Sequence, residues 1–457
     1  MSKGMFKPAW TKLIICCIAL MGCYIYLNLA KWRDRGVIVS DSISYYAYLP
    51  ATFMYHDLSL DFRDKPTCPS DVALWPEKAP NGKKVIKTSM GMAIFYAPLF
   101  FLARCYAFVS QEQMSGYSTH DHLLVGFTAI LYVFLGLLVL RRILIRYFSE
   151  RLTCSVILIL SLGTNLFYYF TVDTMSAHAV GFFLINVFVY YTIRWHEAQK
   201  IKYAILLGLC LGFLTLVRPT NILAAFLFIL FQVYNRDTLF AKFSLLKKNA
   251  GMLCLIPLLT ILVFLPQLLY WKMQTGRYFF NSYVGEVFFF SKPHIIEGLV
   301  GFRKGWLIYT PLMMLFFAGI FFMRQQLRDW FIPCGIFFII ITWVMFSWWC
   351  WWYGGSFGAR VYVDFYGLFA LAIATFIQVV YAKGVTFWKK SLFVFCSVCI
   401  LLNIMQSNQA KSNIIHYDSM TWAKYCTDFF WFGTELDHNA NLLQHPDYEK
   451  AKRCGEE

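Results

Sequence analysis

Apolar residues in this chain gather in stretches long enough to cross a lipid bilayer, with polar connections between them. A transmembrane helix needs about 20 consecutive apolar residues, and eleven stretches come close to this length. We therefore predict eleven membrane-spanning helices. Their limits are 13–30, 123–140, 152–171, 178–193, 203–217, 221–235, 250–269, 306–323, 331–347, 361–381 and 391–407.

A twelfth apolar stretch, residues 90–110, has the length of a helix but is interpreted differently. It contains a glycine, a proline and Arg104. Counting it as a span would also move the basic segment 141–151 to the outer side of the membrane. We expect it to form a juxtamembrane helix that lies on the outer face.

These limits define the predicted organisation of the chain. Residues 1–407 form a transmembrane unit, within which residues 31–122 are the first outer loop with its juxtamembrane helices. Residues 408–457 form an outer C-terminal tail. The predicted fold class is an all-α polytopic membrane protein.

The composition excludes an ordinary soluble domain, and the charge indicates orientation. The chain is 59% hydrophobic and 14% charged, whereas soluble domains have about 45–50% and about 25%. With the N-terminus inside, six inner segments hold 19 of the 41 Lys and Arg residues and only four acids, which leaves the outer side nearly neutral. The net charge of +16 therefore follows the positive-inside rule and does not indicate a nucleic-acid partner. The inner segments are 1–12, 141–151, 194–202, 236–248, 324–330 and 382–390.

Polar side chains gather at the outer ends of the predicted spans, whereas the middle of the spans carries almost no charge. Ion-coupled transporters usually have charged residues near the midplane, so this distribution counts against transport. It favours a site at the outer leaflet that faces both water and lipid headgroups. The polar group comprises Asp41, Lys87, Arg104, Asp173, His178, Arg218, Arg360 and Asp364.

Asp41 opens a tyrosine-rich stretch eleven residues after the first span, and two interpretations are open. It is either the N-cap of a short helix, or a general base at the membrane surface with Tyr45 and Tyr46 packed on a lipid or sugar. Asp173 either caps the span that begins at residue 178 or joins Asp41, if the outer ends of the first and third spans meet.

The remaining candidates also have structural interpretations. A cation at the end of a span is often an interface anchor, an arginine beside tryptophans often stacks on a ring, and interfacial tryptophans commonly form a belt. The first interpretation applies to Lys87 and Arg218, the second to Arg360 and the third to Trp352. His178 fits an interface residue held by a hydrogen bond.

Other outer residues carry no pattern that indicates chemistry. We expect Glu286 and His294 to be solvated, and His120-Asp121-His122 to form an ordinary loop. No spacing typical of metal ligands supports a divalent metal, and the cofactor is unknown.

Taken in order, several short motifs resemble a known superfamily over roughly residues 10 to 370. They resemble the GT-C superfamily of multi-span glycosyltransferases, in particular the bacterial branch similar to protein O-mannosyltransferases and the lipid A aminoarabinose transferase. The motifs are Asp41 with Tyr45-Tyr46, the Lys87 segment running into Tyr96-Ala97-Pro98-Leu99, Asp173 to His178, Leu207 to Phe213 followed by Arg218-Pro219-Thr220-Asn221, and Trp351 to Arg360.

The resemblance implies an inverting enzyme that takes a sugar from a polyprenyl-phosphate-linked donor. The acceptor, a lipid, glycan or protein, would be activated by Asp41 on the periplasmic side of a bacterial inner membrane. A flippase for lipid-linked saccharides and a non-catalytic scaffold for envelope assembly are the alternatives. The implied roles are catalysis for Asp41 and Asp173, donor-phosphate binding for Lys87, Arg218 and Arg360, and substrate binding for Tyr45, Tyr46, His178 and Trp352.

One departure from the resemblance concerns the catalytic carboxylates. Several members of the superfamily have an acidic pair at the first-loop motif, but here Ser42 follows Asp41. A role that needs a second carboxylate would then fall to Asp173.

Overall fold

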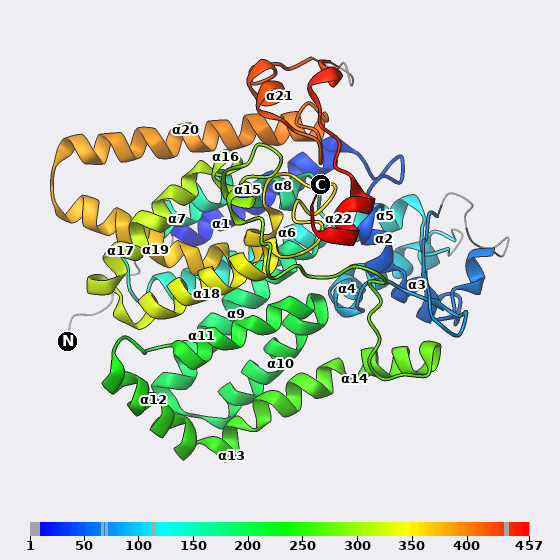
Figure 1. Ribbon diagram of the computed structural model, residues 1–457, viewed down its shortest axis with the longest axis horizontal. Coiled ribbons are helices and arrows are strands. Elements are labelled where there is room, and N and C mark those ends of the chain that lie inside the picture. Colours follow the sequence, from blue (N-terminus) through cyan, green and yellow to red (C-terminus); the bar gives the residue numbers. More distant parts are fainter. Residues whose placement is uncertain (1–9, 65–67, 69–71, 112–114, 434–437, 457) are drawn as a thin grey trace.

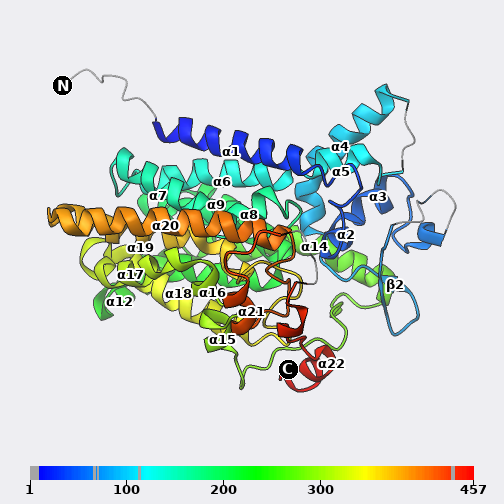
Figure 2. The same ribbon diagram turned by 90° about the horizontal axis from the view of Figure 1, so that it is seen from above.

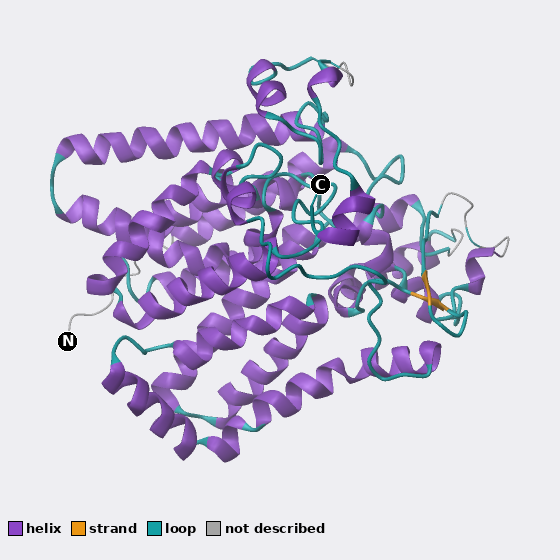
Figure 3. Ribbon diagram, in the orientation of Figure 1, coloured by secondary structure: helices purple, strands orange, loops and turns teal. Residues whose placement is uncertain are grey.

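The computed structural model describes residues 10–64, 68, 72–111, 115–433 and 438–456, and it is helical almost throughout. Figures 1 and 3 show long helices lying side by side along one axis. Within the described residues, the strands are limited to the hairpin of β1 (Glu77–Lys78) and β2 (Lys84–Val85). The predicted all-α polytopic fold is confirmed.

The bundle and its two ends are built from different sets of helices. The long axis is formed by α1 (Trp10–Leu29), α6 (Thr128–Leu144), α7 (Glu150–Leu162), α9 (Ala177–Ala198), α10 (Ile201–Val217), α11 (Ala225–Leu230), α14 (Leu255–Thr275), α17 (Met314–Gln326), α18 (Arg328–Phe346), α19 (Tyr366–Ala382) and α20 (Thr386–Lys411). One end carries α12 (Arg236–Lys248) and α13 (Ala250–Leu253).

Short helices, together with the longer α4, lie at the opposite end of the bundle. They are α2 (Asp41–Tyr46), α3 (Tyr48–Phe53), η1 (Asp61–Asp64), α4 (Gly91–Val109), α5 (Thr119–Val125), α8 (Leu166–Thr171), η2 (Pro219–Ala224), α15 (Ile295–Val300), α16 (Trp306–Tyr309), η3 (Pro311–Met313), η4 (Arg360–Phe365), α21 (Trp422–Thr427), η5 (Ala440–Leu442) and α22 (Tyr448–Cys454).

Eight stretches of helix among the described residues are long and apolar enough to cross a membrane. Seven of them coincide with predicted spans, and the eighth is α4. The predicted spans 152–171, 203–217, 221–235 and 306–323 correspond instead to shorter or interrupted helices. The structure therefore differs from the prediction at 152–171, 221–235 and 306–323, where the helices are interrupted, whereas α10 covers 203–217 without a break.

Prolines mark two places where one helix ends and the next begins. Pro219 and Pro311 each start a short 3₁₀ helix directly after an α-helix has ended. A proline lacks the backbone N–H that continues a helix, and it holds the preceding residue in an extended conformation. Arg218 accordingly has φ −147° and ψ 115°, and α10 ends directly before it.

The segments predicted to face the inside meet at one end of the bundle. Interactions connect the segments 1–12, 141–151, 194–202 and 236–248 to one another, and the segments 324–330 and 382–390 each contact a residue near the inner end of a predicted span. This grouping is what the charge pattern predicted. The contacts are Thr11 with Glu150, Arg146 with Glu197, His196 with Lys242, Gln232 with Asp329, and Lys383 with the ring of Phe322.

The other end carries the segments predicted to be outside. Figure 2 shows α4 running across this end at an angle to α1 and α6, as expected for a helix that lies on the outer face. The η4–α19 stretch is central in the bundle, because 78% of the residues in its most apolar segment are buried. In the α13–α14 stretch, only 11% of the corresponding residues are buried. The exposed apolar side chains of α14 are therefore available to lipid.

Candidate functional site

The first loop and η4 bring a carboxylate and a guanidinium together at the outer end. Asp41 is the first residue of α2 and Arg360 the first of η4, and Arg360 Nη2 donates to Asp41 Oδ2 over 3.3 Å. The Asp41 side chain is 59% exposed and that of Arg360 is 17% exposed. The pair therefore offers a carboxylate to water while its cation is held in the protein.

The N-cap interpretation of Asp41 does not describe this geometry. The N-cap of α2 is Ser40, whose side chain makes no capping hydrogen bond. Asp41 lies inside the first turn, where a negative charge is favourable, and its carboxylate is directed to Arg360 instead.

Asp173 lies close to this pair, as the sequence allowed. Lys31 Nζ donates to the carbonyl oxygen of Val172 over 3.3 Å, so the outer ends of the first and third predicted spans do meet. The N-cap of α9 is Ser176 and not Asp173. Burial raises the pKa of Asp173 above its usual value, and the positive charges of Arg360 and Lys31 oppose that rise. The negative charge of Asp41 adds to it.

Arg360 is held in place by contacts between distant segments, which the sequence analysis did not predict. The buried Lys304 donates to the carbonyl oxygens of Ser356 and Tyr417, which ties the link before Arg360 to the tail. On the other side, the Tyr169 hydroxyl bonds both the N–H and the C=O of Phe357. The 348–360 link is thus fixed between the bundle and the tail.

A second group surrounds Arg218. His178 Nδ1 lies 2.6 Å from Asp364 Oδ1, and Asn221 Nδ2 donates to Asp364 Oδ2 over 3.1 Å. Arg218 Nη1 lies 3.0 and 3.4 Å from the two ring nitrogens of His178 and 4.0 Å from Asp364 Oδ1. Asp364 is 1% exposed. This carboxylate joins the outer ends of α9, η2 and η4.

Lys87 belongs to a third contact, which corrects the expectation for Glu286. Glu286 is only 9% exposed and forms an ion pair with Lys87, and Trp349 Nε1 donates to its other oxygen over 3.0 Å. The rings of Trp75 and Tyr283 also lie within cation–π distance of the Lys87 ammonium. Glu286 is therefore a buried counter-ion and not a solvated loop residue.

His294 was also expected to be solvated, and the structure places it in a contact with the tail. Its Nε2 lies 2.6 Å from the carbonyl oxygen of Gly455, and its ring stacks on Trp351. The loop that contains Glu286 and His294 therefore packs against the site and the tail.

The predicted substrate-binding aromatic residues divide into two groups. Tyr45 is half-buried, and burial together with the Asp41 charge raises the pKa of its hydroxyl, while the Arg218 charge opposes the rise. Tyr46 is fully buried and donates to the carbonyl oxygen of Gly116 over 2.7 Å. Trp352 is buried against Tyr448 of the tail. The structure thus brings Tyr45 to the charged group but not Tyr46 or Trp352.

No group of three or more His, Cys, Asp or Glu side chains suited to a metal occurs within the described part of the chain. In His120-Asp121-His122, Asp121 completes a capping box with Ser118 and pairs with Arg104. His122 Nδ1 accepts hydrogen bonds from the backbone of the first loop. The expectation of an ordinary loop is therefore wrong: these residues lie in α5, and their contacts organise the fold of the first outer loop.

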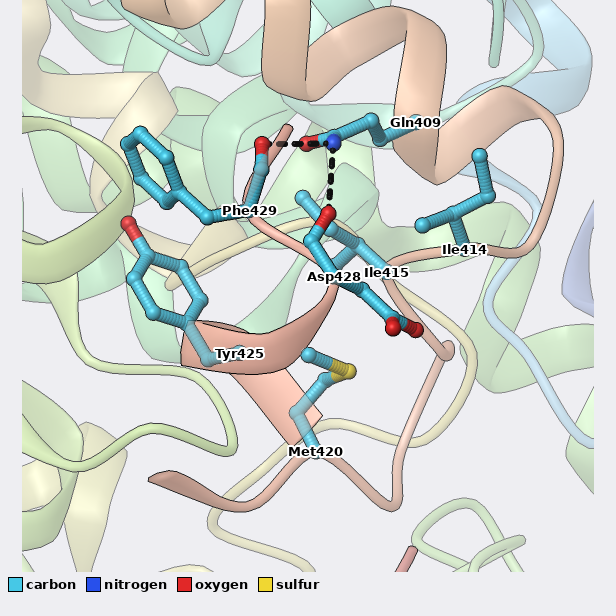
Figure 4. Close-up of a pocket in the computed structure, with 7 residues that line it drawn as sticks. All are labelled: Gln409, Ile414, Ile415, Met420, Tyr425, Asp428 and Phe429. Carbon is cyan, nitrogen blue, oxygen red and sulfur yellow. Dashed lines mark hydrogen bonds between the residues drawn. The ribbon is translucent and has the colours of Figure 1, made fainter. Parts of the chain in front are cut away.

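Figure 4 shows a pocket elsewhere, between the end of α20 and the tail. Gln409 Nε2 donates there to the carbonyl oxygens of Asp428, Phe429 and Trp431 over 2.9 to 3.1 Å. This amide uses its donors to hold the tail, so we attribute the pocket to tail packing and not to the site.

Sequence reasoning missed two features of the site. Glu286 was overlooked because its partners, Lys87 and Trp349, come from distant segments. Asp364 was placed at an outer helix end without a role, although a carboxylate inside an apolar span is itself a signal of a specific partner.

Comparisons with known proteins identify the fold. No protein-family model and no curated protein sequence matches this chain. The crystal structure of the oligosaccharyltransferase of Archaeoglobus fulgidus in the apo form is similar over 99% of the chain, with a TM-score of 0.50 and 12% sequence identity. The chain spans 64% of that protein's length. The likeness supports the polytopic helical fold, and the bacterial branch suggested by the motifs stays a prediction.

Proposed function

We propose that this protein is an integral-membrane glycosyltransferase that moves a sugar from a polyprenyl-phosphate-linked donor to an acceptor hydroxyl, with inversion. The observation that carries the proposal is the exposed Asp41 carboxylate beside cationic groups at one end of an apolar helix bundle. The fold likeness to an oligosaccharyltransferase supports glycosyl transfer as the general chemistry.

The proposed reaction needs few protein groups because the leaving group is already an anion. The acceptor oxygen attacks the anomeric carbon from the side opposite the phosphate, and the bond between that carbon and the phosphate oxygen breaks. The bonding electrons leave with the phosphate, and the acceptor proton passes to a carboxylate. The protein supplies a base on one side and positive charge on the other.

Asp41 is the proposed base, and Asp173 lies close enough to take part. A base must reach an acceptor that arrives from water, lipid or another protein, and the exposure of Asp41 meets this requirement. Arg360 holds the carboxylate from its buried side and leaves one of its oxygens for the acceptor. We do not assign the base to Asp173, because burial raises its pKa and favours the protonated form, which cannot accept the acceptor proton.

The proposed phosphate-binding cations are Arg218, Lys87 and Arg360. They differ in how closely a carboxylate pairs with each of them. Lys87 is paired with Glu286, and Arg360 with Asp41. Within the described residues, Arg218 has no carboxylate oxygen nearer than 4.0 Å. Its remaining N–H groups make it the best donor for a phosphate. His178 and Tyr45 lie beside it and would contact the same headgroup.

The proposed location is a bacterial inner membrane, with the site on the periplasmic side. The inner segments carry the positive charge, and the proposed site lies at the opposite end of the bundle. Polyprenyl-phosphate sugars and their acceptors would meet at that outer surface.

A direct test uses the purified protein in lipid vesicles with a panel of polyprenyl-phosphate-linked hexoses and pentoses and a membrane extract as the source of acceptor. We expect acceptor-dependent release of polyprenyl phosphate from at least one donor, with the opposite anomeric configuration in the product. Movement of intact lipid-linked sugar across the vesicle membrane, without release of polyprenyl phosphate from any donor, would favour a flippase instead.

A further inference from the structure

Within the described residues, the carboxylate oxygen nearest to Arg218 lies 4.0 Å away, and this spacing has a structural origin. A buried guanidinium normally needs a counter-charge. Here the counter-charge is Asp364, whose carboxylate lies 4.0 Å from Arg218 Nη1. The His178 ring contacts both the carboxylate and the guanidinium. Asp364 thus balances Arg218 without occupying its hydrogen-bond donors.

We propose that Asp364 is a positioning residue that acts through His178 to hold Arg218 in its phosphate-binding orientation. This inference rests on the proposed function, in which Arg218 binds the donor phosphate. Asp364 accepts one hydrogen bond from the ring of His178 and one from Asn221, which is three residues after Arg218 in the same turn. The carboxylate therefore fixes both the ring and the backbone segment that carry the guanidinium.

The fit around Asp364 explains a glycine in α9. Gly181 lies one turn after His178, and a β-carbon at this position would overlap the Asp364 carboxylate. Only glycine lets the carboxylate approach the helix this closely, so that one Asp364 oxygen reaches His178 while the other reaches Asn221.

The geometry also determines the tautomer of the ring. When His178 Nδ1–H donates to the carboxylate 2.6 Å away, Nε2 carries the lone pair, and Arg218 Nη1 lies against the ring, 3.0 Å from Nδ1 and 3.4 Å from Nε2. A carboxylate commonly orients a histidine in this way, and the histidine then presents a defined face to its next partner. The chain of contacts runs from Asp364 through His178 to Arg218.

The experiment measures binding of a sugar-free polyprenyl monophosphate to the full-length protein in detergent, for the wild type, Asp364→Asn, Arg218→Ala and the double variant. Asparagine keeps the shape of the side chain but cannot accept from both His178 and Asn221. We expect Asp364→Asn to weaken binding by about tenfold, and we expect no further loss when it is added to Arg218→Ala. Such coupling is the signature of two residues that act as one unit.

The sign of the effect distinguishes positioning from simple charge balance. Removing a negative charge near Arg218 strengthens the attraction for an anion, so a residue that only balances charge would give tighter binding in Asp364→Asn. Tighter or unchanged binding therefore overturns the proposal. A loss that persists undiminished in the Arg218→Ala background also overturns it, because Asp364 would then act on the fold and not through Arg218.

A second variant keeps the test decisive if Asp364→Asn folds poorly. Gly181→Ala displaces the carboxylate without changing any charge, and we expect it to weaken binding in the same Arg218-dependent way. Gly335→Ala in α18 is the matched control, because a β-carbon there meets no other atom within 4 Å. Unaltered binding in Gly181→Ala contradicts the proposal. Failure of the wild type to bind the lipid phosphate would overturn the proposed function itself.

Discussion

The Asp41 carboxylate and the Arg360 guanidinium lie 3.3 Å apart although 319 residues separate them in the chain. Arg360 is held by the link before η4, and that link is held in turn by Lys304, Tyr169 and the tail. The guanidinium that contacts the exposed carboxylate is therefore held by segments from distant parts of the chain. This dependence makes the pair the first place to test the proposed chemistry.

Asp41→Asn should leave a folded protein that binds the donor but hardly transfers sugar. Asparagine keeps the size of the side chain, but it cannot accept the proton of the acceptor. Loss of a general base typically lowers turnover by a factor on the order of 10²–10⁴. The measurement is sugar transfer from the polyprenyl-phosphate donor, made beside expression level, thermal midpoint and lipid binding.

The control for this substitution is Asp34→Asn, which removes another exposed carboxylate seven residues earlier in the first loop. It should leave transfer unchanged. If Asp41→Asn retained transfer within about threefold of the wild type, far above the loss expected for a base, Asp41 would not be the base. Asp173 would then be the next carboxylate to test.

The three candidate cations should contribute unequally to donor binding. Arg218→Ala should weaken binding of polyprenyl phosphate by about 10- to 100-fold, the range expected when a hydrogen bond to a charged group is lost. Lys87→Ala should cause a smaller loss, because Glu286 already neutralises that ammonium. Equilibrium titration of both variants checks the order, and a larger loss in Lys87→Ala would place the phosphate beside Trp75 and Tyr283 instead.

The pair of Lys87 and Glu286 should also contribute to stability. Removing one partner of a buried ion pair leaves an uncompensated charge and typically costs about 3–5 kcal/mol. Lys87→Met alone should therefore lower the thermal midpoint clearly. Adding Glu286→Gln should restore much of the loss, since no charge is then left unpaired. If the two losses simply added, the ion pair would contribute no coupling energy.

Asp173 should make stability depend on pH in a defined direction. Burial raises its pKa in the folded protein, so the folded state binds a proton more readily than the unfolded state. Stability is then greatest below the ordinary aspartate pKa and falls as the pH rises through the raised value. Asp173→Asn should remove this loss. Its thermal midpoint should exceed that of the wild type at pH 7, with the difference shrinking on acidification towards pH 4.

The sequence predicted the fold class, and it predicted that the candidate charged residues lie at one end of the bundle, because both follow from long-range averages. Apolar length determines which segments lie in the membrane, and the basic connections determine which ends meet. The placement of Asp41, Arg218 and Arg360 at one end follows from those two patterns. The same averages do not separate uninterrupted helices from broken ones, although Pro219 and Pro311 were local signals for the breaks.

The partners of the charged residues were not readable from the sequence. Glu286 lies in a polar loop and was expected to be solvated, yet Lys87 and Trp349 bury it from segments far away in the chain. His178 and Asp364, 186 residues apart, meet because η4 packs against the start of α9. Such pairings depend on how helices pack in three dimensions, which periodicity alone does not encode.

The adjacent tyrosines of α2 provide a final test, because both were predicted to bind substrate while the structure separates their environments. The Tyr46 hydroxyl is buried and donates to the carbonyl oxygen of Gly116. Tyr46→Phe leaves that acceptor unpaired, so it should lower the free energy of unfolding by about 1–3 kcal/mol and leave turnover per folded molecule unchanged. Tyr45 is half-buried near the charges of Asp41 and Arg218. Tyr45→Phe should therefore lower turnover or donor affinity with little effect on the thermal midpoint. Measuring both quantities for both variants separates the roles, and a turnover defect in Tyr46→Phe at full stability would return Tyr46 to the site.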